Sequence, residues 1–243
     1  MLEGLYTAAA GMAAQQQRMD ALSNDVANVN TAGYKRVRVG FRDLVYQASG
    51  PGGNVRTGAG AAIVQLGRGS EQGAFLKTDQ PFDLAIEGDG YFQVRKAGTG
   101  QIALTRNGQL QVNANGQLVT AEGDQLVPPI TLPRGIDPNR VTIGADGTLT
   151  AGTRRLGQIQ LVTVPAPTGL AAAGNGYYTV TAASGGVRRA TTANLQQGML
   201  EGSNVNLADA MVDMMDAQRS YSMASKAIHM QDQMMEIANG VKQ

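Results

Sequence analysis

The sequence predicts a mixed α and β fold, in which an all-β central domain is flanked by N- and C-terminal helices that pair as an antiparallel coiled coil. Three observations predict it: an apolar heptad near the start, a second heptad near the end, and turn-rich sequence with short apolar segments between them. A single amphipathic helix cannot bury its own apolar stripe, so the two ends need each other or neighbouring copies of the chain.

The first helix is predicted to run from about Leu2 to Asn28. Small residues on its other faces (Ala8, Ala10, Ala13 and Ala14) would let a second helix approach closely, and Gly33 is the expected site of a positive φ after the helix. Spacing of three and four places Ala9 and Gln16 on the face of the heptad. The residues expected to form the assembly interface of this helix are Leu2, Leu5, Met12, Met19, Leu22 and Val26.

Residues 34–69 are predicted to be an extended linker segment. Alternation of apolar residues from Val37 to Phe41 indicates a short extended piece, and the Gly-rich stretch 48–60 indicates a flexible surface connector. The basic residues Lys35, Arg36, Arg38 and Arg42 are expected to form a solvated surface. The alternative is that they pair with acidic residues of a neighbouring subunit.

Residues 70–203 are predicted to form the β-rich outer domain. Turn residues separate its short apolar segments, with hairpin signals at Asn107-Gly108, Asn115-Gly116 and Asp146-Gly147 and a further turn at Gly88-Asp89-Gly90. Three segments, 102–105, 110–112 and 118–120, follow one another closely, as in a meander.

The last helix is predicted to begin near Asn206, with Ser203 or Asn204 as its cap, and to continue to about Ala238 before Gly240. Ala210, Ala217 and Ala224 fill its intervening heptad position. Residues 1–33 and 204–243 together form the predicted helical assembly domain. The residues expected at the interface of the last helix are Leu207, Met211, Met214, Tyr221, Ile228 and Met235.

Composition excludes several classes of function. The formal net charge is +1, which gives no electrostatic basis for binding nucleic acid, and cysteine is absent. No run of about 18 apolar residues exists, so no membrane insertion is expected. The N-terminus also lacks the features of a cleavable secretory signal.

Residues able to carry chemistry are few. His229 is the only histidine, so we expect no metal ligand set, no cofactor and no catalytic residues. The carboxylates Asp83, Glu87 and Asp89 are clustered, but a solvated strand face explains them better than the opposed pair of a glycosidase. Two alternatives come from other classes of function: a β-scaffold extracellular hydrolase and a soluble adhesin or binding module.

Three stretches resemble one known family. Residues 21–36 (ALSNDVANVNTAGYKR) resemble the N-terminal signature of bacterial flagellar rod and hook proteins. Residues 83–94 (DLAIEGDGYFQV) with Thr105-Arg106-Asn107-Gly108, and residues 200–206 (LEGSNVN), are similar to its second and third signatures. The family-motif residues are Asn24, Asn28, Thr31, Gly33, Lys35, Arg36, Gly88, Gly90, Phe92, Gly202, Ser203 and Asn204.

Within that family the chain is most similar to the distal rod proteins, on residues 43–47 (DLVYQ) and 129–133 (PITLP). The segment after Gln47 is shorter than in typical distal rod proteins, and a proximal rod or hook-type subunit is the alternative.

The resemblance implies a non-enzymatic subunit of the basal-body rod, which polymerises into a hollow helical shaft and transmits torque from the motor to the hook. The implied partners are further copies of itself, other rod proteins below, the hook protein above and the surrounding bushing rings. The implied location is the periplasm-spanning rod, reached by type III export without a cleaved signal peptide.

Overall fold

The computed structural model describes residues 2–44, 47–49, 55–58, 60–133, 135 and 138–240. Helix α1 (Leu2–Ala27) and helix α2 (Leu207–Gly240) flank a region that is mostly β. At this level the predicted fold class is confirmed. Contacts divide the chain into a helical unit (Met1–Ala27, Val37–Leu66 and Asn206–Gln243) and a β-rich unit (Asn28–Arg36 and Gly67–Val205).

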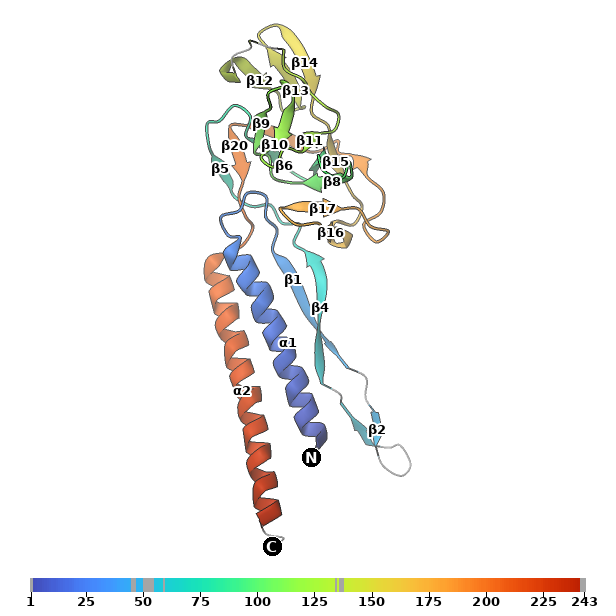
Figure 1. Cartoon of the computed structure of the whole chain (residues 1–243), viewed down its shortest axis with the longest axis vertical. Coiled ribbons are helices and arrows are strands. Elements are labelled where there is room, and N and C mark those ends of the chain that lie inside the picture. Colours follow the sequence, from blue (N-terminus) through green and yellow to red (C-terminus); the bar gives the residue numbers. More distant parts are fainter. Residues whose placement is uncertain are drawn as a thin grey trace. The chain divides into compact units, whose positions relative to one another are not determined.

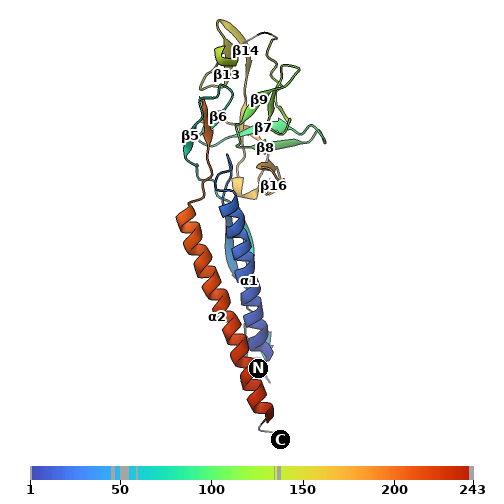
Figure 2. The same cartoon turned by 60° about the vertical axis from the view of Figure 1, so that its left-hand side comes forward.

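In the helical unit, α1 and α2 lie side by side (Figures 1 and 2). Arg18 Nη2 is 3.0 Å from Asp213 Oδ1, and a side chain at Gly4 would meet Gln231. Residues early in α1 thus lie beside residues late in α2, so the helices run in opposite directions. The predicted caps of α2 are wrong: Asn206 caps it, because Asn206 Oδ1 accepts a hydrogen bond from the amide of Ala208 at 3.0 Å.

Part of the predicted linker is a paired structure in the helical unit. Strand β1 (Val37–Asp43) pairs with β4 (Ala61–Arg68), and the short strands β2 (Gln47–Ser49) and β3 (Val55–Thr57) pair with each other within the stretch expected to be a flexible connector. Alternating apolar residues in β1 favour this pairing. α1 contacts the paired segment, since a Cβ at Gly60 would be 2.9 Å from that of Ala10.

The β-rich unit consists of short strands and two 3₁₀ turns. The strands of its largest sheet follow the order β16-β17-β8-β7-β11-β10-β9, and β15 joins β7 to β18. Smaller sheets are β12-β13-β14, β19-β6 and β20-β5. The elements are β5 (Phe75–Lys77), β6 (Leu84–Glu87), β7 (Tyr91–Arg95), β8 (Ile102–Thr105), β9 (Leu110–Val112), β10 (Leu118–Thr120), β11 (Gln125–Leu126), η1 (Pro138–Arg140), β12 (Val141–Ile143), β13 (Thr148–Ala151), β14 (Arg154–Gln158), β15 (Leu161–Thr163), η2 (Pro167–Gly169), β16 (Ala171–Ala172), β17 (Tyr177–Thr179), β18 (Arg188–Arg189), β19 (Asn194–Gln197) and β20 (Met199–Glu201).

One main hydrophobic core holds this unit together. Leu84 and Ile86 from β6 and Phe92 and Val94 from β7 are fully buried in it, together with Leu149 from β13. Burying each such side chain stabilises the fold by about 1.5–3 kcal/mol. The alternating apolar residues read from the sequence therefore supply the interior of this unit.

Two of the three predicted hairpins are confirmed. Gly116 (φ +79°) turns the chain between the paired strands β9 and β10, and Gly147 (φ +80°) does so between β12 and β13. The hairpin predicted at Asn107-Gly108 is wrong, because β8 pairs with β7 and β17 while β9 pairs with β10. Glycine is needed at 108 for another reason: a Cβ there would lie 1.7 Å from the carbonyl oxygen of Leu84.

Candidate functional site

The three family-signature stretches meet in the β-rich unit. The amide of Gly33 donates to the carbonyl of Glu201 at 2.7 Å, and the amide of Arg36 donates to Asn204 Oδ1 at 2.7 Å. A Cβ at Gly33 would lie 2.7 Å from the backbone of Arg106, and Gly33 has a φ of +69°, as predicted. Segments far apart in the sequence thus converge on one place, which we call the signature junction (residues 33–36, 106–108 and 201–204).

A buried ion cluster lies at the signature junction. Lys35, Arg106 and Glu201 are 2%, 3% and 1% exposed. Lys35 Nζ is 2.5 Å from Glu201 Oε1, and Arg106 Nη1 is 3.1 Å from Glu201 Oε2. The expectation that Lys35 belongs to a solvated surface or pairs with a neighbouring subunit is wrong, because Lys35 pairs inside its own chain.

Backbone groups complete the cluster. Lys35 Nζ also donates to the carbonyl of Glu71 at 2.6 Å, and Arg106 Nη2 donates to the carbonyl of Gly88 at 2.9 Å. The amide of Gly73 donates to Glu201 Oε1 at 3.1 Å. Glu201 therefore accepts from three donors, which compensates for much of the cost of removing its charge from water.

Burial controls the electrostatics of this cluster. It lowers the pKa of Lys35, and the contact with Glu201 opposes that change in pKa only in part. Aromatic rings surround the cations: Arg106 lies 5.3 Å from the ring centroid of Tyr91, and Arg68 lies over the rings of Tyr34 and Tyr178. These buried contacts hold three chain segments together.

The other motif residues have local structural roles. Gly88 (φ +92°) precedes β7, Gly90 packs against Ala193, and Phe92 belongs to the core. Thr31 Oγ1 donates to Asn28 Oδ1 at 3.1 Å after the end of α1. Asn24 is exposed on α1, Gly202 is buried beside Ala74, and Ser203 accepts from the amide of Val205.

Glu201 and Arg106 lie within the family signatures but are not among the residues predicted as site residues. A charged residue directly after the apolar pair Met199-Leu200, inside a signature, was the available signal for Glu201. Its partners were not predictable, since Lys35 and Arg106 come from chain segments 166 and 95 residues away.

The predicted interface residues of α1 lie at the border of its buried face. Leu22 is buried, whereas Leu5, Met12, Met19 and Val26 are half-buried; the side chain of Leu2 lies outside the described part. Ala9 and Gln16, which the spacing places on the same face as these residues, are exposed in the single chain. The most buried side chains of α1 are Ala14, Leu22 and Asp25, because α1 contacts both α2 and β1.

The predicted seam of α2 is only partly buried within one chain. Met214, Ile228 and Met235 are half-buried, and the small residues Ala210 and Ala217 are buried. Leu207, Met211 and Tyr221 are exposed by 40%, 52% and 36%. A single chain therefore leaves part of the predicted seam uncovered, and the small residues Ala210 and Ala217 are the ones buried most deeply.

A second apolar face of α2 is exposed in the single chain. Positions 13 residues apart on a helix, such as Ala217 and Met230, point about 140° away from each other. We call the exposed set the outer face of α2. It covers about half of the helix circumference, includes the seam residues Leu207 and Met211, and adds Val212, Met215, Met223, Met230, Met234 and Ile237. Large exposed apolar patches are typical of interaction surfaces.

The described residues offer few other candidates for a functional site. His229 is exposed on α2. Within the described ranges, no group of three histidine, cysteine or carboxylate residues is arranged to hold a metal ion. None of the described helices combines the length and the apolar character that crossing a membrane requires.

Comparison with known families gives consistent matches along the chain. Residues 5–35 match the family described as "Flagella basal body rod protein", and residues 85–151 match "Flagellar hook protein FlgE/F/G D1 domain". Residues 196–241 match "Flagellar basal body rod FlgEFG protein C-terminal". Each match includes all or most of one of the segments that meet at the signature junction.

Full-length relatives carry corresponding names. The chain is 37% identical to the flagellar basal-body rod protein FlgG of Borreliella burgdorferi, over 100% of this chain and 99% of the relative. It is 35% identical to FlgG of Bacillus subtilis, over 97% of both chains, and 34% identical to the flagellar hook-basal body complex protein FlhP of the same organism, over 100% of both. On this full-length similarity, the chain belongs to the flagellar basal-body rod protein family.

Proposed function

We propose that this chain is a non-enzymatic, distal-type subunit of the flagellar basal-body rod, which polymerises through its terminal helices into a hollow helical shaft that transmits torque to the hook. The outer face of α2 carries the proposal. Met230 and Ile237 on this face are 57% and 67% exposed in a single chain. Covering such side chains by neighbouring copies would supply about 25 cal/mol for each Å² of apolar surface removed from water.

The difference between the exposed surfaces of the two helices favours an open assembly. Among the described side chains of α1, the exposed ones include Tyr6, Ala9, Ala13 and Gln16 and no methionine, so this surface differs in composition from the outer face of α2. Two unlike surfaces meet heterologously, and heterologous contacts propagate along a helical array when their rotation does not close. In this arrangement the antiparallel helices form a coiled coil in the inner wall, and the predicted outer domain (70–203) lies around it.

Predicted interface residues divide between two roles in this proposal. One set joins the two helices of one subunit and consists of Leu5, Met12, Met19, Leu22, Met214, Ile228 and Met235. The other set contacts neighbouring copies and consists of Leu207, Met211 and Tyr221. Methionine suits the second role, because its flexible side chain fills irregular gaps between helices.

The proposed partners and location follow from the family. Adjacent components would be other rod proteins, the hook protein and the surrounding rings, with the shaft spanning the periplasm after type III export. The relatives named FlgG support a rod position, and FlhP is named as a hook-basal body complex protein. Locating the chain relative to the hook junction in purified basal bodies tests the distal position against a proximal one.

The central test is Met230→Glu with Met230→Leu as its matched control. We expect Met230→Glu to leave the melting temperature of the monomer unchanged, because the side chain is exposed, and to abolish rod assembly and motility. An unpaired charge in a buried interface costs several kcal/mol. Met230→Leu keeps an apolar side chain of similar size and should assemble.

Two readouts separate the outcomes of this test. Sedimentation of the purified chain reports the folded monomer, and electron microscopy of basal bodies from cells expressing only the variant reports rods. Normal rods containing Met230→Glu would contradict the proposed contact surface. A wild-type chain that stays monomeric at high concentration and is absent from basal bodies would contradict the function itself.

A further inference from the structure

Methionine is unevenly distributed along this chain. Most of its 11 methionines lie on α2, whereas the sequence of the β-rich unit contains only Met199. Cysteine is absent. Sulfur chemistry in this protein is therefore methionine chemistry, and most of it belongs to one helix.

The methionines of α2 divide between two faces. With about 100° per residue, one group lies within an arc of about 140° around the helix axis. Its members are 49% to 64% exposed, and we call them the outer methionines: Met211, Met215, Met223, Met230 and Met234. The inner methionines, Met214 and Met235, lie at least about 60° outside that arc and are half-buried. Solvent therefore reaches the outer group most easily.

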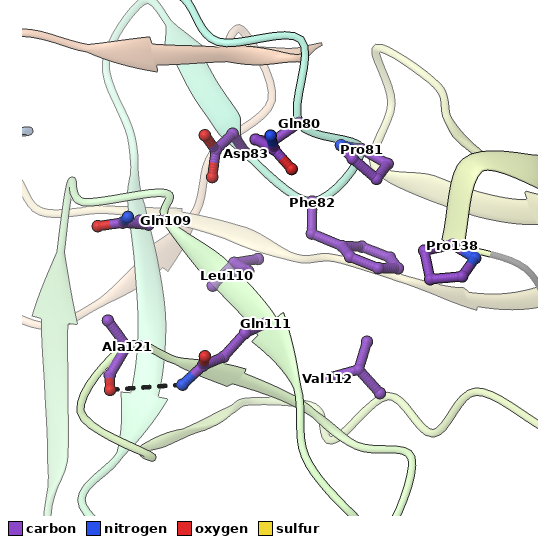
Figure 3. A pocket seen from close by; sticks show the side chains of 10 residues that line it. All are labelled: Gln80, Pro81, Phe82, Asp83, Gln109, Leu110, Gln111, Val112, Ala121 and Pro138. Carbon is purple, nitrogen blue, oxygen red and sulfur yellow. Dashed lines mark hydrogen bonds between the residues drawn. The ribbon is translucent and has the colours of Figure 1, made fainter.

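The β-rich unit offers an oxidant much less sulfur. Met199 is half-buried in β20. A groove of about 510 Å³ in this unit is lined by Phe82, Val112 and Pro138 together with polar side chains, and none of the residues labelled in Figure 3 contains sulfur. Oxidation of methionine would thus change the surface of α2 and leave the groove as it is.

An exposed methionine reacts with a peroxide in one step. The sulfur atom donates a lone pair to one oxygen of hydrogen peroxide, the O–O bond breaks, and an S–O bond forms as a water molecule leaves. Sulfur loses the two electrons that peroxide gains, and the thioether becomes a sulfoxide. Because the peroxide must reach the sulfur atom, exposed methionines react first.

A sulfoxide has different consequences in a free chain and in an assembled one. Its oxygen is a hydrogen-bond acceptor, which water satisfies wherever the side chain is exposed. Between packed helices the same oxygen would be buried among apolar groups, and a buried acceptor without a donor is unfavourable. Oxidation of the outer methionines should therefore weaken association without unfolding the single chain.

We propose that the outer methionines form a redox-sensitive site. Peroxides oxidise them in the unassembled chain and so prevent its addition to the rod, whereas neighbouring copies exclude peroxide from them in the assembled rod. This inference rests on the proposed function, in which neighbouring copies cover the outer face of α2. It adds the modification of that face, the class of oxidant and the step of assembly that is blocked.

Mapping of oxidation tests the site without any substitution. We expect brief treatment of the purified chain with hydrogen peroxide to oxidise the outer methionines several-fold faster than Met214 and Met235, as measured by peptide mass spectrometry. The melting temperature of the oxidised chain should stay unchanged, and a methionine sulfoxide reductase should remove the added oxygen. In purified basal bodies the outer methionines should react at least about tenfold more slowly than in the purified chain.

Leucine variants test the effect on assembly, because leucine keeps an apolar side chain of similar size and cannot be oxidised in this way. The outer variant combines Met211→Leu, Met215→Leu, Met223→Leu, Met230→Leu and Met234→Leu. Its matched control is the inner variant Met214→Leu/Met235→Leu. The single variant Met230→Leu repeats the test with the smallest change in packing and should give partial protection.

Each variant is expressed as the only copy of the chain, and hydrogen peroxide is added while new rods are built, at a dose that leaves growth unchanged. We expect the number of new rods, counted by electron microscopy, to fall at least about tenfold in the wild type and the inner variant, and much less in the outer variant. Damage to other proteins is common to all strains, so the difference between strains reports the outer methionines.

The outcomes separate this site from the proposed function. Equal losses of rods in the wild type, the outer variant and Met230→Leu would overturn the redox site and leave the function intact. The same conclusion would follow if the inner methionines reacted as fast as the outer ones, or if oxidation unfolded the purified chain. Absence of the unmodified chain from basal bodies would overturn the proposed function instead.

Discussion

At the signature junction, Glu201 is surrounded by two cations and a backbone amide of the same chain, whereas the outer face of α2 presents methionines that a single chain leaves exposed. The charged groups of the signature junction, which are the costliest groups to bury, find their partners within one molecule. The outer face of α2 is incomplete and contains the groups that gain most from burial. In a chain that folds first and assembles later, stability and association can thus reside in different residues.

Two of the described ion pairs illustrate the same difference. Lys35–Glu201 is almost fully buried, while the side chains of Arg18 and Asp213, which join α1 to α2, are 25% and 32% exposed. A solvent-exposed pair contributes about 0–1 kcal/mol, but removing one partner of a buried pair costs about 3–5 kcal/mol. The β-rich unit is therefore the part whose fold depends on charge.

The largest effect is expected from Glu201→Gln. The substitution keeps the side-chain volume but leaves Lys35 and Arg106 buried without a carboxylate, so we expect the free energy of unfolding to fall by about 3–5 kcal/mol. Urea titration of the monomer, followed by the near-ultraviolet circular dichroism of its tyrosines, measures this loss.

The matched control for that experiment is Glu87→Gln. Glu87 is exposed and accepts one hydrogen bond from Gln196 at 3.0 Å, so the change in its free energy of unfolding should stay within about 0.5 kcal/mol. Equal effects at positions 87 and 201 would mean that the signature junction is not the charge-dependent part of the fold.

What the sequence revealed also differs between the two regions. Strands β8, β9 and β10 coincide with predicted apolar segments, because alternation is a local property of the chain. The family signatures indicated where the family-motif residues lie, but not that Glu201 joins them, because ion pairs across 95 and 166 residues leave no local pattern.

The helices were predicted as elements, but the face through which they meet was not. Heptads located both helices, yet they placed Met211 in a seam, whereas Met211 is exposed in the single chain and Ala210 and Ala217 are buried. A helix with two apolar faces has no single stripe, so periodicity alone cannot say which face meets α1 and which stays exposed.

Amide hydrogen exchange on the monomer extends the comparison to dynamics. We expect the core strands β6 and β7 to exchange only through global unfolding and the C-terminal half of α2 to exchange at least about 100-fold faster, because few apolar contacts hold it in a single chain. Assembled rods should protect α2 strongly. A monomer in which α2 is as protected as β7 would show that the helical unit is complete without neighbours.

The smallest expected effect is a pH dependence that belongs to the signature junction alone. Burial lowers the pKa of Lys35 below its usual value of 10.5, so between the lowered pKa and 10.5 the unfolded chain binds more protons than the folded chain. Stability should therefore rise with pH in that window, by at most about 1.4 kcal/mol per pH unit for one group.

The ionisation of tyrosines sets the highest pH at which that dependence can be measured. Burial raises the pKa of Tyr91 and of Tyr178, so above about pH 10 their ionisation in the unfolded chain lowers stability and opposes the lysine. Urea midpoints of the wild type and of Lys35→Met should therefore be compared below pH 10. We expect the slope to flatten in Lys35→Met and to persist in Lys77→Met, since Lys77 is exposed in its pair with Asp79. A slope that survives Lys35→Met would place the titrating group outside the junction.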